Sequence, residues 1–165
     1  MALHGSILQG SDSMEGSIEW MTPKEVFDPL HAEFGFQLDA CASPGMERLP
    51  RYFSPAQDGL QQSWASQADV IWCNPPYGRQ LKLWVEKCYE ESCKGATVVM
   101  LIFAVTDTKF WHEYCMKAKE IRLVEGRIQF VNADGRKGPA TKASAIVVFD
   151  GVQWDKPAFS SWRFK

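Results

Sequence analysis

In Val70-Ile71-Trp72-Cys73-Asn74-Pro75-Pro76-Tyr77-Gly78, a short apolar run leads directly into a loop that contains two prolines and a tyrosine. The apolar run predicts a buried strand, and ligand sites in open α/β sheets lie beyond the carboxyl ends of such strands. The prolines fix the backbone and remove two amide donors, which leaves carbonyl oxygens free to accept hydrogen bonds from a ligand. We therefore expect a rigid ligand-binding loop at residues 74–77, although the pattern also fits a plain turn after a strand.

Apolar patterns on both sides of this loop predict alternating helices and strands. Thr22-Pro23-Lys24-Glu25 has the pattern of a helix start, with Thr22 as the cap, and Gly35 predicts the end of that helix. A second helix is expected to begin near Leu81 and to end at Gly95. The apolar run at 96–103 has no polar face, so we expect a central strand covered on both sides. Further strands are expected at 36–42, 68–73, 120–124, 127–131 and 144–150, and a further helix at 108–118 with Asp107 as its cap.

This order of elements indicates an α/β fold, a compact three-layer sandwich whose sheet is mostly parallel and ends in an antiparallel strand. Residues 1–17 are rich in glycine and serine and have no periodicity, so we expect a flexible N-terminal tail there. Residues 18–165 are expected to form one domain. The polar stretch 132–142 contains Asp134-Gly135 and is expected to join two antiparallel strands.

The composition is that of an ordinary globular chain. Its 165 residues are 45% hydrophobic and 23% charged, with a net charge of −2 at pH 7, which suits one sizeable core. No apolar run approaches the ~20 residues that span a bilayer, and no signal-peptide pattern opens the chain, so we expect a cytoplasmic protein. The five cysteines form no Cys-x-x-Cys pair, so we expect reduced thiols and no metal site. Because the net charge is negative, any nucleic-acid binding needs a local basic patch.

Methylation of an exocyclic amine is one reaction that the loop at 74–77 suits. The lone pair of adenine N6 is delocalised into the ring, which makes this nitrogen a poor nucleophile. The side-chain oxygen of Asn74 and the carbonyl oxygen of Pro75 can hold its two hydrogens and so favour a tetrahedral nitrogen with a localised lone pair. Tyr77 offers a face on which a planar base can stack. With a sulfonium methyl donor, positioning matters more than a strong base.

The loop is one of six short motifs that follow one another along the chain. They are Trp20-Met21-Thr22-Pro23, Leu38-Asp39-Ala40-Cys41-Ala42-Ser43, Asp58-Gly59-Leu60, Asn74-Pro75-Pro76-Tyr77-Gly78, Thr106-Asp107-Thr108-Lys109 and Gly126-Arg127-Ile128-Gln129-Phe130. As a set they resemble the phage-type DNA adenine methyltransferases of the Dam family, over nearly all of residues 18–149.

This resemblance implies a Rossmann-like methyltransferase fold that uses S-adenosylmethionine. It implies methyl transfer to the N6 amine of adenine in double-stranded DNA. It also implies protection of phage or prophage DNA from restriction, in the host cytoplasm if a phage encodes the chain.

The resemblance further implies roles for individual residues. The catalytic loop is Asn74, Pro75, Pro76 and Tyr77, and Phe130 packs on the target base opposite Tyr77. Four of these residues can also be explained by a purely structural role. Thr22 can cap a helix, Asp39 and Asp58 can stabilise turns, and Phe130 can belong to the core. The residues implied in cofactor binding are Thr22, Asp39, Ala40, Cys41, Ala42 and Asp58.

Contact with DNA is expected from short loops, because the sequence indicates no separate target-recognition domain. We expect the polar stretch 132–142 to recognise the DNA sequence. The residues expected to contact DNA are Arg127, Arg136, Lys137 and Lys142. These side chains can reach guanine edges or only phosphates, and each also fits ordinary solvated surface charge. The sequence is compatible with a monomer and with a homodimer, and a dimer would enlarge the DNA-binding surface.

Three alternative functions are open on the sequence alone. An adenine in RNA can be splayed into the same pocket, and a glutamine side-chain amide in a protein poses the same chemical problem. A catalytically inactive nucleic-acid-binding or decoy protein is the third alternative, and Ser43-Pro44-Gly45 favours it because only one glycine stands where a glycine-rich cofactor loop is usual. The intact loop at 74–77 favours catalysis, since a binding module has no need of it.

Overall fold

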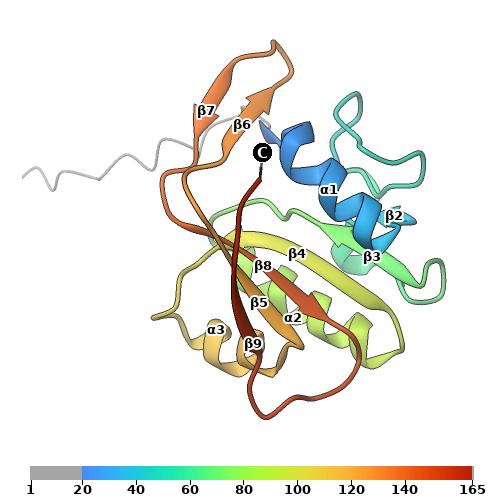
Figure 1. Ribbon diagram of the computed structural model, residues 1–165. Coiled ribbons are helices and arrows are strands. Elements are labelled where there is room, and N and C mark those ends of the chain that lie inside the picture. The colour runs from blue at the N-terminus through green and yellow to red at the C-terminus, as the bar shows by residue number, and fades with distance from the viewer. Residues whose placement is uncertain (1–19, 165) are drawn as a thin grey trace, which may run out of the picture.

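The computed structural model describes residues 20–164, which form a central six-stranded sheet with helices on both faces (Figure 1). The expected N-terminal tail at 1–17 lies outside the described residues. Strands β2, β3 and β4 run parallel, β8 is antiparallel to both of its neighbours, and β9 is parallel to β5. The strands in their spatial order are β2 (Leu38–Asp39), β3 (Val70–Cys73), β4 (Thr97–Phe103), β8 (Ser144–Phe149), β5 (Glu120–Val124) and β9 (Ala158–Trp162).

The mostly parallel sheet confirms the sequence prediction, but the antiparallel strand lies elsewhere than expected. β8 lies inside the sheet, between β4 and β5, and is not its last strand. All six of its residues are buried, so hydrogen-bonding partners on both edges and cover on both faces suit it better than an edge position. The edge is formed by β9, which the sequence did not predict because its residues are mostly exposed and lack an apolar pattern.

The sheet separates the apolar core into two clusters, one on each of its faces, and helices cover both. α1 (Lys24–Phe34) buries Val26, Phe27 and Leu30 against one face. α2 (Leu81–Cys93) buries Leu81, Trp84, Val85 and Cys88 against the other, with the 3–4 residue spacing of a helix packed along one side. α3 (Lys109–Glu113) joins the same cluster through Trp111. The predicted three-layer arrangement is therefore present (Figure 1).

Two predicted elements are shorter than expected. The strand predicted at 36–42 is reduced to β2, although the amides of Gln37 and Ala40 still donate to carbonyl oxygens of the neighbouring β3 segment. The helix predicted at 108–118 breaks after α3, and a 3₁₀ turn, η2 (Cys115–Lys117), follows. The cap of α3 is Thr108 without a side-chain hydrogen bond, so the prediction of Asp107 as the cap was wrong.

A second, three-stranded sheet projects from the top of the molecule in Figure 1. It consists of β1 (Trp20–Met21), β6 (Gln129–Asn132) and β7 (Lys137–Pro139), all antiparallel. The stretch 132–142 was predicted to connect two antiparallel strands, but it contains β7 itself: its turn joins the antiparallel strands β6 and β7, and the strands that flank the stretch, β6 and β8, lie in different sheets. Asn132 shapes the turn, because its side-chain oxygen accepts hydrogen bonds from the amides of Asp134 and Arg136 at 3.1 and 2.8 Å.

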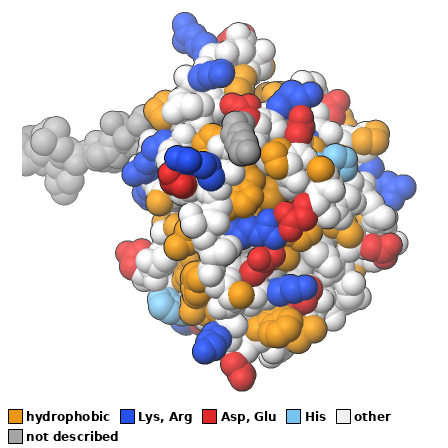
Figure 2. Space-filling view, viewed as in Figure 1, with side chains coloured by type: hydrophobic (Ala, Val, Ile, Leu, Met, Phe, Trp, Pro, Cys, Tyr) orange, Lys and Arg blue, Asp and Glu red, His pale blue; other side chains and the backbone are white. Residues whose placement is uncertain are grey.

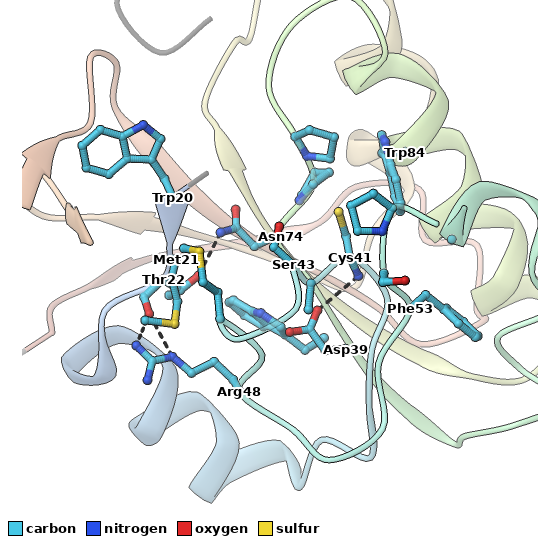
Figure 3. A pocket seen from close by; sticks show the side chains of 18 of the residues that line it. Trp20, Met21, Thr22, Asp39, Cys41, Ser43, Arg48, Phe53, Asn74 and Trp84 are labelled. Carbon is cyan, nitrogen blue, oxygen red and sulfur yellow. Dashed lines mark hydrogen bonds between the residues drawn. The ribbon is translucent and has the colours of Figure 1, made fainter. Parts of the chain in front are cut away.

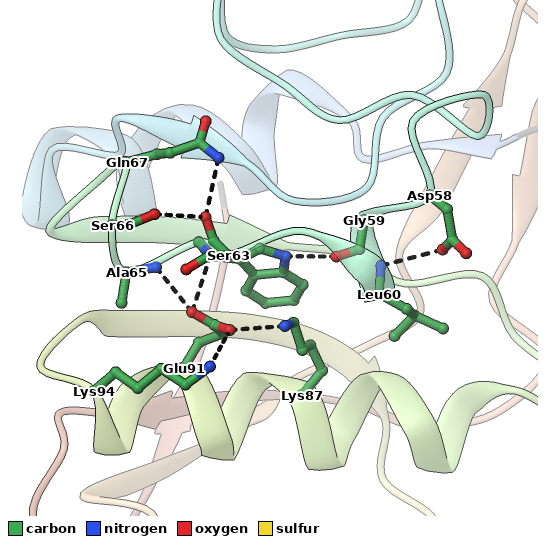
Figure 4. Close-up of polar contacts among 11 residues, drawn as sticks. Asp58, Gly59, Leu60, Ser63, Ala65, Ser66, Gln67, Lys87, Glu91 and Lys94 are labelled. Carbon is green, nitrogen blue, oxygen red and sulfur yellow. Dashed lines mark hydrogen bonds and ion pairs between the residues drawn. The ribbon is translucent and has the colours of Figure 1, made fainter.

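The long irregular segment between β2 and β3 is attached to α2 by Glu91 of that helix (Figure 4). The side chain of Glu91 is fully buried, and one carboxylate oxygen accepts hydrogen bonds from the amides of Trp64 and Ala65 at 3.0 and 2.9 Å. The other oxygen pairs with Lys87 at 2.7 Å and Lys94 at 2.9 Å. Burial alone would raise the pKa of Glu91, but these hydrogen bonds and lysines lower it to about 2.

No helix within residues 20–164 is long and apolar enough to cross a membrane. The longest of the described helices, α2, has 13 residues, which is well short of the ~20 that a bilayer requires.

We expect Glu91→Ala to lower the free energy of unfolding by about 3 kcal/mol, because it leaves the partly buried Lys87 and two amide donors without their acceptor. Chemical denaturation followed by circular dichroism measures this change. The neighbouring Glu90 is exposed, so Glu90→Ala is the matched control and should change the value by less than about 0.5 kcal/mol. Equal effects of the two substitutions would contradict the tethering role of Glu91.

Candidate active site

A cavity of about 590 Å³ lies beyond the carboxyl ends of β2 and β3 (Figure 3). Its walls come from β1, from the segment that follows β2, from the 3₁₀ turn η1 (Gly59–Gln61), from the loop after β3 and from α2. This is the position at which the sequence predicted a ligand site, and the whole predicted loop Asn74–Tyr77 lines the cavity. Its volume is within the range of small-molecule sites, roughly 300–1,000 Å³.

Asn74 is held by a residue that lies 52 positions earlier in the chain. Its side-chain nitrogen donates to the Thr22 hydroxyl oxygen at 2.9 Å, and the Tyr77 hydroxyl donates weakly to its side-chain oxygen at 3.5 Å. The prediction that Thr22 caps α1 was therefore wrong, since Pro23 occupies the cap position and no side chain bonds there. The two contacts orient the amide so that its donor side faces Thr22.

Tyr77 belongs to an aromatic group at one end of the cavity. Its ring stacks on Phe103 with centroids 4.0 Å apart and an angle of 14°, and it meets Phe130 edge-on at 6.4 Å and 74°. Burial raises the pKa of the Tyr77 hydroxyl well above its ordinary value, so this group stays protonated and neutral. Phe130 also lines the cavity but has no exposed surface, so base stacking on it stays a prediction, and it supports Tyr77 from the side.

Asp39 lies at the end of β2, buried in the wall of the cavity. Burial raises the pKa of its carboxyl group to about 7, although a hydrogen bond from the Cys41 amide at 3.1 Å and the nearby Arg48 oppose this rise. Arg48 itself donates twice to the carbonyl oxygen of Thr22, at 2.6 and 3.1 Å. A group whose pKa lies near neutrality inside a cavity is typical of functional sites.

Asp58 and Gly59 form a constrained corner of the cavity. Asp58 adopts the left-handed conformation at φ 49°, and its carboxylate accepts a hydrogen bond from the Leu60 amide at 3.2 Å. A Cβ atom at Gly59 would collide with the carbonyl oxygen of Ala40 and would stand 3.0 Å from the ring of Trp84. The predicted Asp-Gly turn is therefore present, and only glycine fits its second position.

The structure brings most of the residues predicted for cofactor binding to this one cavity. Ala40 is the exception, because it is fully buried behind the wall and supplies the backbone carbonyl that approaches Gly59. Several further lining residues were given no role by the sequence, although Trp20 and Trp72 stand within the quoted stretches. The predicted residues in the lining are Thr22, Asp39, Cys41, Ala42 and Asp58, and the unpredicted ones include Trp20, Arg48, Phe53, Trp72 and Trp84.

The four basic residues predicted to contact DNA lie outside the cavity. Arg136 and Lys137 stand at the β6–β7 turn, and Arg127 and Lys142 flank the two strands of this hairpin, all of them exposed. Figure 2 shows lysine and arginine side chains over the projecting hairpin, while the rest of that face carries charges of both signs. The hairpin also contacts the cavity wall, because Trp20 packs on Gly138, where a Cβ would stand 2.6 Å from the indole ring.

Among residues 20–164, no group of three or more His, Cys, Asp or Glu side chains is placed to hold a metal ion.

The sequence of the chain matches a known protein family. Residues 12–161 match the model of the DNA N-6-adenine-methyltransferase (Dam) family, and the chain belongs to this family. The resemblance stated from the six motifs is thereby confirmed. The DNA N-6-adenine-methyltransferase of Haemophilus phage HP1 (strain HP1c1) is similar, with 33% identity over 117 residues, which cover 68% of this chain. The match spans 66% of the length of that relative.

We expect Asp39 to lower the stability of the protein as the pH rises from about 4 to about 7. The pKa of Asp39 is raised by folding from 3.8 to about 7, so the folded state retains a proton that the unfolded state releases between these values. Asn at this position cannot ionise, and Asp39→Asn should flatten this part of the profile. Melting temperatures across this pH range measure the effect.

The exposed Asp155 provides the control for this experiment. Asp155→Asn should leave the slope of melting temperature against pH unchanged. A slope that is the same in the native chain and in Asp39→Asn would show that Asp39 does not retain its proton on folding.

Proposed function

We propose that the protein transfers a methyl group from S-adenosylmethionine to the N6 amine of adenine in DNA. The observation that carries this proposal is the position of Asn74, which lies in the cavity beyond β3 with its amide oriented by Thr22. Membership of the Dam family and the similarity to the phage enzyme support the same reaction. The parallel strands β2, β3 and β4, with a cavity beyond the carboxyl ends of β2 and β3 and helices on both faces, support a Rossmann-like methyltransferase fold.

The proposed chemistry rests on two acceptors in the loop after β3. The side-chain oxygen of Asn74 points away from Thr22, since the side-chain nitrogen is the atom bonded there, and it can accept one hydrogen of the target amine. The carbonyl oxygen of Pro75 can accept the other, which localises the nitrogen lone pair. Phe103 covers one face of the Tyr77 ring, so the opposite face is the one on which a base can stack, with Phe130 at its edge.

The residues of the cavity fit S-adenosylmethionine, which supplies an electrophilic methyl group when it is bound. Asp39 is a buried carboxyl group suited to the methionine ammonium, which would favour its ionised form. Thr22, Cys41 and Ala42 line the same region, and Ala40 supports it from behind. Asp58 can accept from the amine of the cofactor's adenine, because a carboxylate that already accepts from Leu60 retains further lone pairs.

Double-stranded DNA is the proposed partner, and the β6–β7 hairpin is its proposed contact. The overall charge of −2 gives no general attraction to nucleic acid, so binding depends on the local group Arg127, Arg136, Lys137 and Lys142. The hairpin shares a sheet with β1, which leads directly into Thr22. DNA held by the hairpin would therefore lie close to the cavity. Modification of phage DNA against restriction, in the host cytoplasm, is the proposed setting.

We expect methyl-free DNA incubated with the purified protein and S-adenosylmethionine to accumulate N6-methyladenine, measured by nucleoside mass spectrometry. Asn74→Ala should lower the rate by at least about a hundredfold, because the effect of removing one well-placed transition-state partner is of that order. Calorimetric titration with S-adenosylhomocysteine should show that this variant still folds and binds. RNA and a glutamine-containing protein are offered in parallel, and methylation of either in place of DNA would overturn the proposed substrate.

We expect the double substitution Arg136→Ala with Lys137→Ala to weaken DNA binding and to reduce its dependence on salt. Each phosphate contact that is lost lowers the slope of log K against log salt by about 0.9. Fluorescence anisotropy with a duplex oligonucleotide at several salt concentrations measures both quantities. Lys156→Ala removes an exposed lysine from the loop between β8 and β9, at the opposite end of the molecule from the hairpin in Figure 1. If this control weakens binding as much as the hairpin variant, the hairpin is not the DNA contact.

A further inference from the structure

Two exposed cations follow the loop Asn74–Tyr77 along the chain. Arg79 and Lys82 are both exposed, and Gln80 between them lines the cavity. Gly78 has a φ of 113°, which favours glycine, at the point where the chain leaves the loop and approaches α2. The two side chains therefore lie at the rim of the cavity, on the side formed by α2.

Most lysine and arginine side chains of residues 20–164 have a partner within the protein. Glu91, for example, pairs with both Lys87 and Lys94. The side chains that form no ion pair, hydrogen bond or ring contact with another described residue are the four basic ones at the β6–β7 hairpin, the pair Arg79 and Lys82, and Lys156. Apart from Lys156, the unpaired positive charge is thus concentrated around the cavity.

The hairpin and the pair Arg79 and Lys82 lie on different sides of that cavity. The hairpin contacts the wall through Trp20, which packs on Gly138. α2 contributes Trp84 to the wall, and Gln80 lines it at the start of the same helix. Figure 3 shows Trp20 and Trp84 on opposite sides, with Asn74 between them. An extended anion across the mouth of the cavity would therefore meet positive charge on both sides.

Folding alone does not account for cations at this position. Arg79 and Lys82 stand at the N-terminal end of α2, where the helix dipole disfavours positive charge. The first turn contains no acidic residue to offset them, and Gln80 forms no side-chain capping bond. A local arrangement that opposes stability without compensation within the protein is typical of a functional surface.

Methylation of adenine in duplex DNA gives such a surface a specific use. The target nucleotide must rotate about the backbone of its strand to bring the base into a cavity. A contact on one side of this nucleotide leaves the other half of the strand free to move with the base. Phosphate contacts on both sides hold the strand in place while the base rotates, and such contacts fix position without reading sequence.

We infer that Arg79 and Lys82 bind phosphates of the DNA strand that carries the target adenine, on the side of the cavity opposite the hairpin. This inference rests on the proposed function and adds a second DNA contact to it. Arg79 and Lys82 act in it as positioning residues, because they hold the strand and do not touch the amine that is methylated.

The salt dependence of DNA binding provides the first test. Arg79→Ala combined with Lys82→Ala should weaken binding of a duplex oligonucleotide in fluorescence anisotropy. The slope of log K against log salt should fall by about 0.9 for each phosphate contact that is lost, or by about 1.8 for both. Arg79→Lys combined with Lys82→Arg keeps both charges and should retain the native slope. An unchanged slope in the alanine variant would overturn the inference.

A matched control removes two exposed lysines from the other end of the molecule. Lys119 and Lys156 precede β5 and β9, which run in the same direction as β4, so both lie at the end of the sheet away from the cavity. Lys119→Ala combined with Lys156→Ala should leave the slope unchanged. If this control lowers the slope as much as the loss of Arg79 and Lys82, the effect is general charge and the inferred contact is wrong.

Uncharged phosphates locate the contact on the strand. Two duplexes carry methylphosphonates on either the 5′ or the 3′ side of the adenine that the protein methylates. On one of these sides, we expect the replacement to weaken binding by the native protein but not by the variant that lacks Arg79 and Lys82. On the other side, it should weaken binding by both. Equal losses for the two proteins on both sides would contradict the inference.

The outcomes separate this inference from the proposed function. Calorimetric titration with S-adenosylhomocysteine should give native affinity for the variant without Arg79 and Lys82, since neither residue lines the cavity. If the native protein methylates DNA and this variant binds DNA with the native slope, only the inference fails. If the native protein neither binds nor methylates DNA, the proposed function fails and the inference fails with it.

Discussion

The hydrogen bond from the Asn74 amide to the Thr22 hydroxyl joins the two sheets of the molecule at the cavity. Asn74 follows β3 of the main sheet, and Thr22 follows β1, which is hydrogen-bonded to β6 of the small sheet. The same Thr22 accepts from Arg48 through its carbonyl oxygen, so three separate segments of chain meet at one residue. The orientation of the Asn74 amide and the position of β1 beside the cavity are therefore linked through Thr22.

The irregular segment between β2 and β3 is the other part of the site that needs explicit support. It contains no long helix or strand and yet supplies Phe53, Asp58 and η1 to the cavity. Side-chain contacts hold it in place: Glu91 binds its backbone from α2, and Arg48 ties it to the end of β1. Charged side chains thus take the place of regular secondary structure here, and the burial of Glu91 is workable because it has four hydrogen-bond and ion-pair partners.

The main sheet and the loop Asn74–Tyr77 could be predicted from the sequence because their signals are local. The apolar runs at Val70–Cys73 and Thr97–Phe103 are strands as expected, and the loop after the first of them lines the cavity. The family resemblance predicted that Asp39 and Asp58 belong to the same site. Strands β1 and β7 were missed because they have only two or three residues, too few to show a period.

The contacts that complete the site could not be predicted, because they join residues far apart in the chain. Thr22 fits a capping pattern, and only the folded chain shows that its hydroxyl serves Asn74. Arg48 lies in a stretch without periodicity, so no local signal marks it as a residue of the cavity wall. Trp84 fits an ordinary helical apolar stripe, and only the folded chain shows that it lines the cavity.

Gly59 carries a consequence for how this family can diverge. Any side chain there would collide with the carbonyl of Ala40, so selection for a folded protein alone is enough to retain the glycine. A descendant that lost its activity would keep Gly59 for packing, whereas at position 74 only the hydrogen bonds with Thr22 and Tyr77 would still favour asparagine. Retention of Gly59 in a relative is therefore explained by packing alone and carries no information about activity.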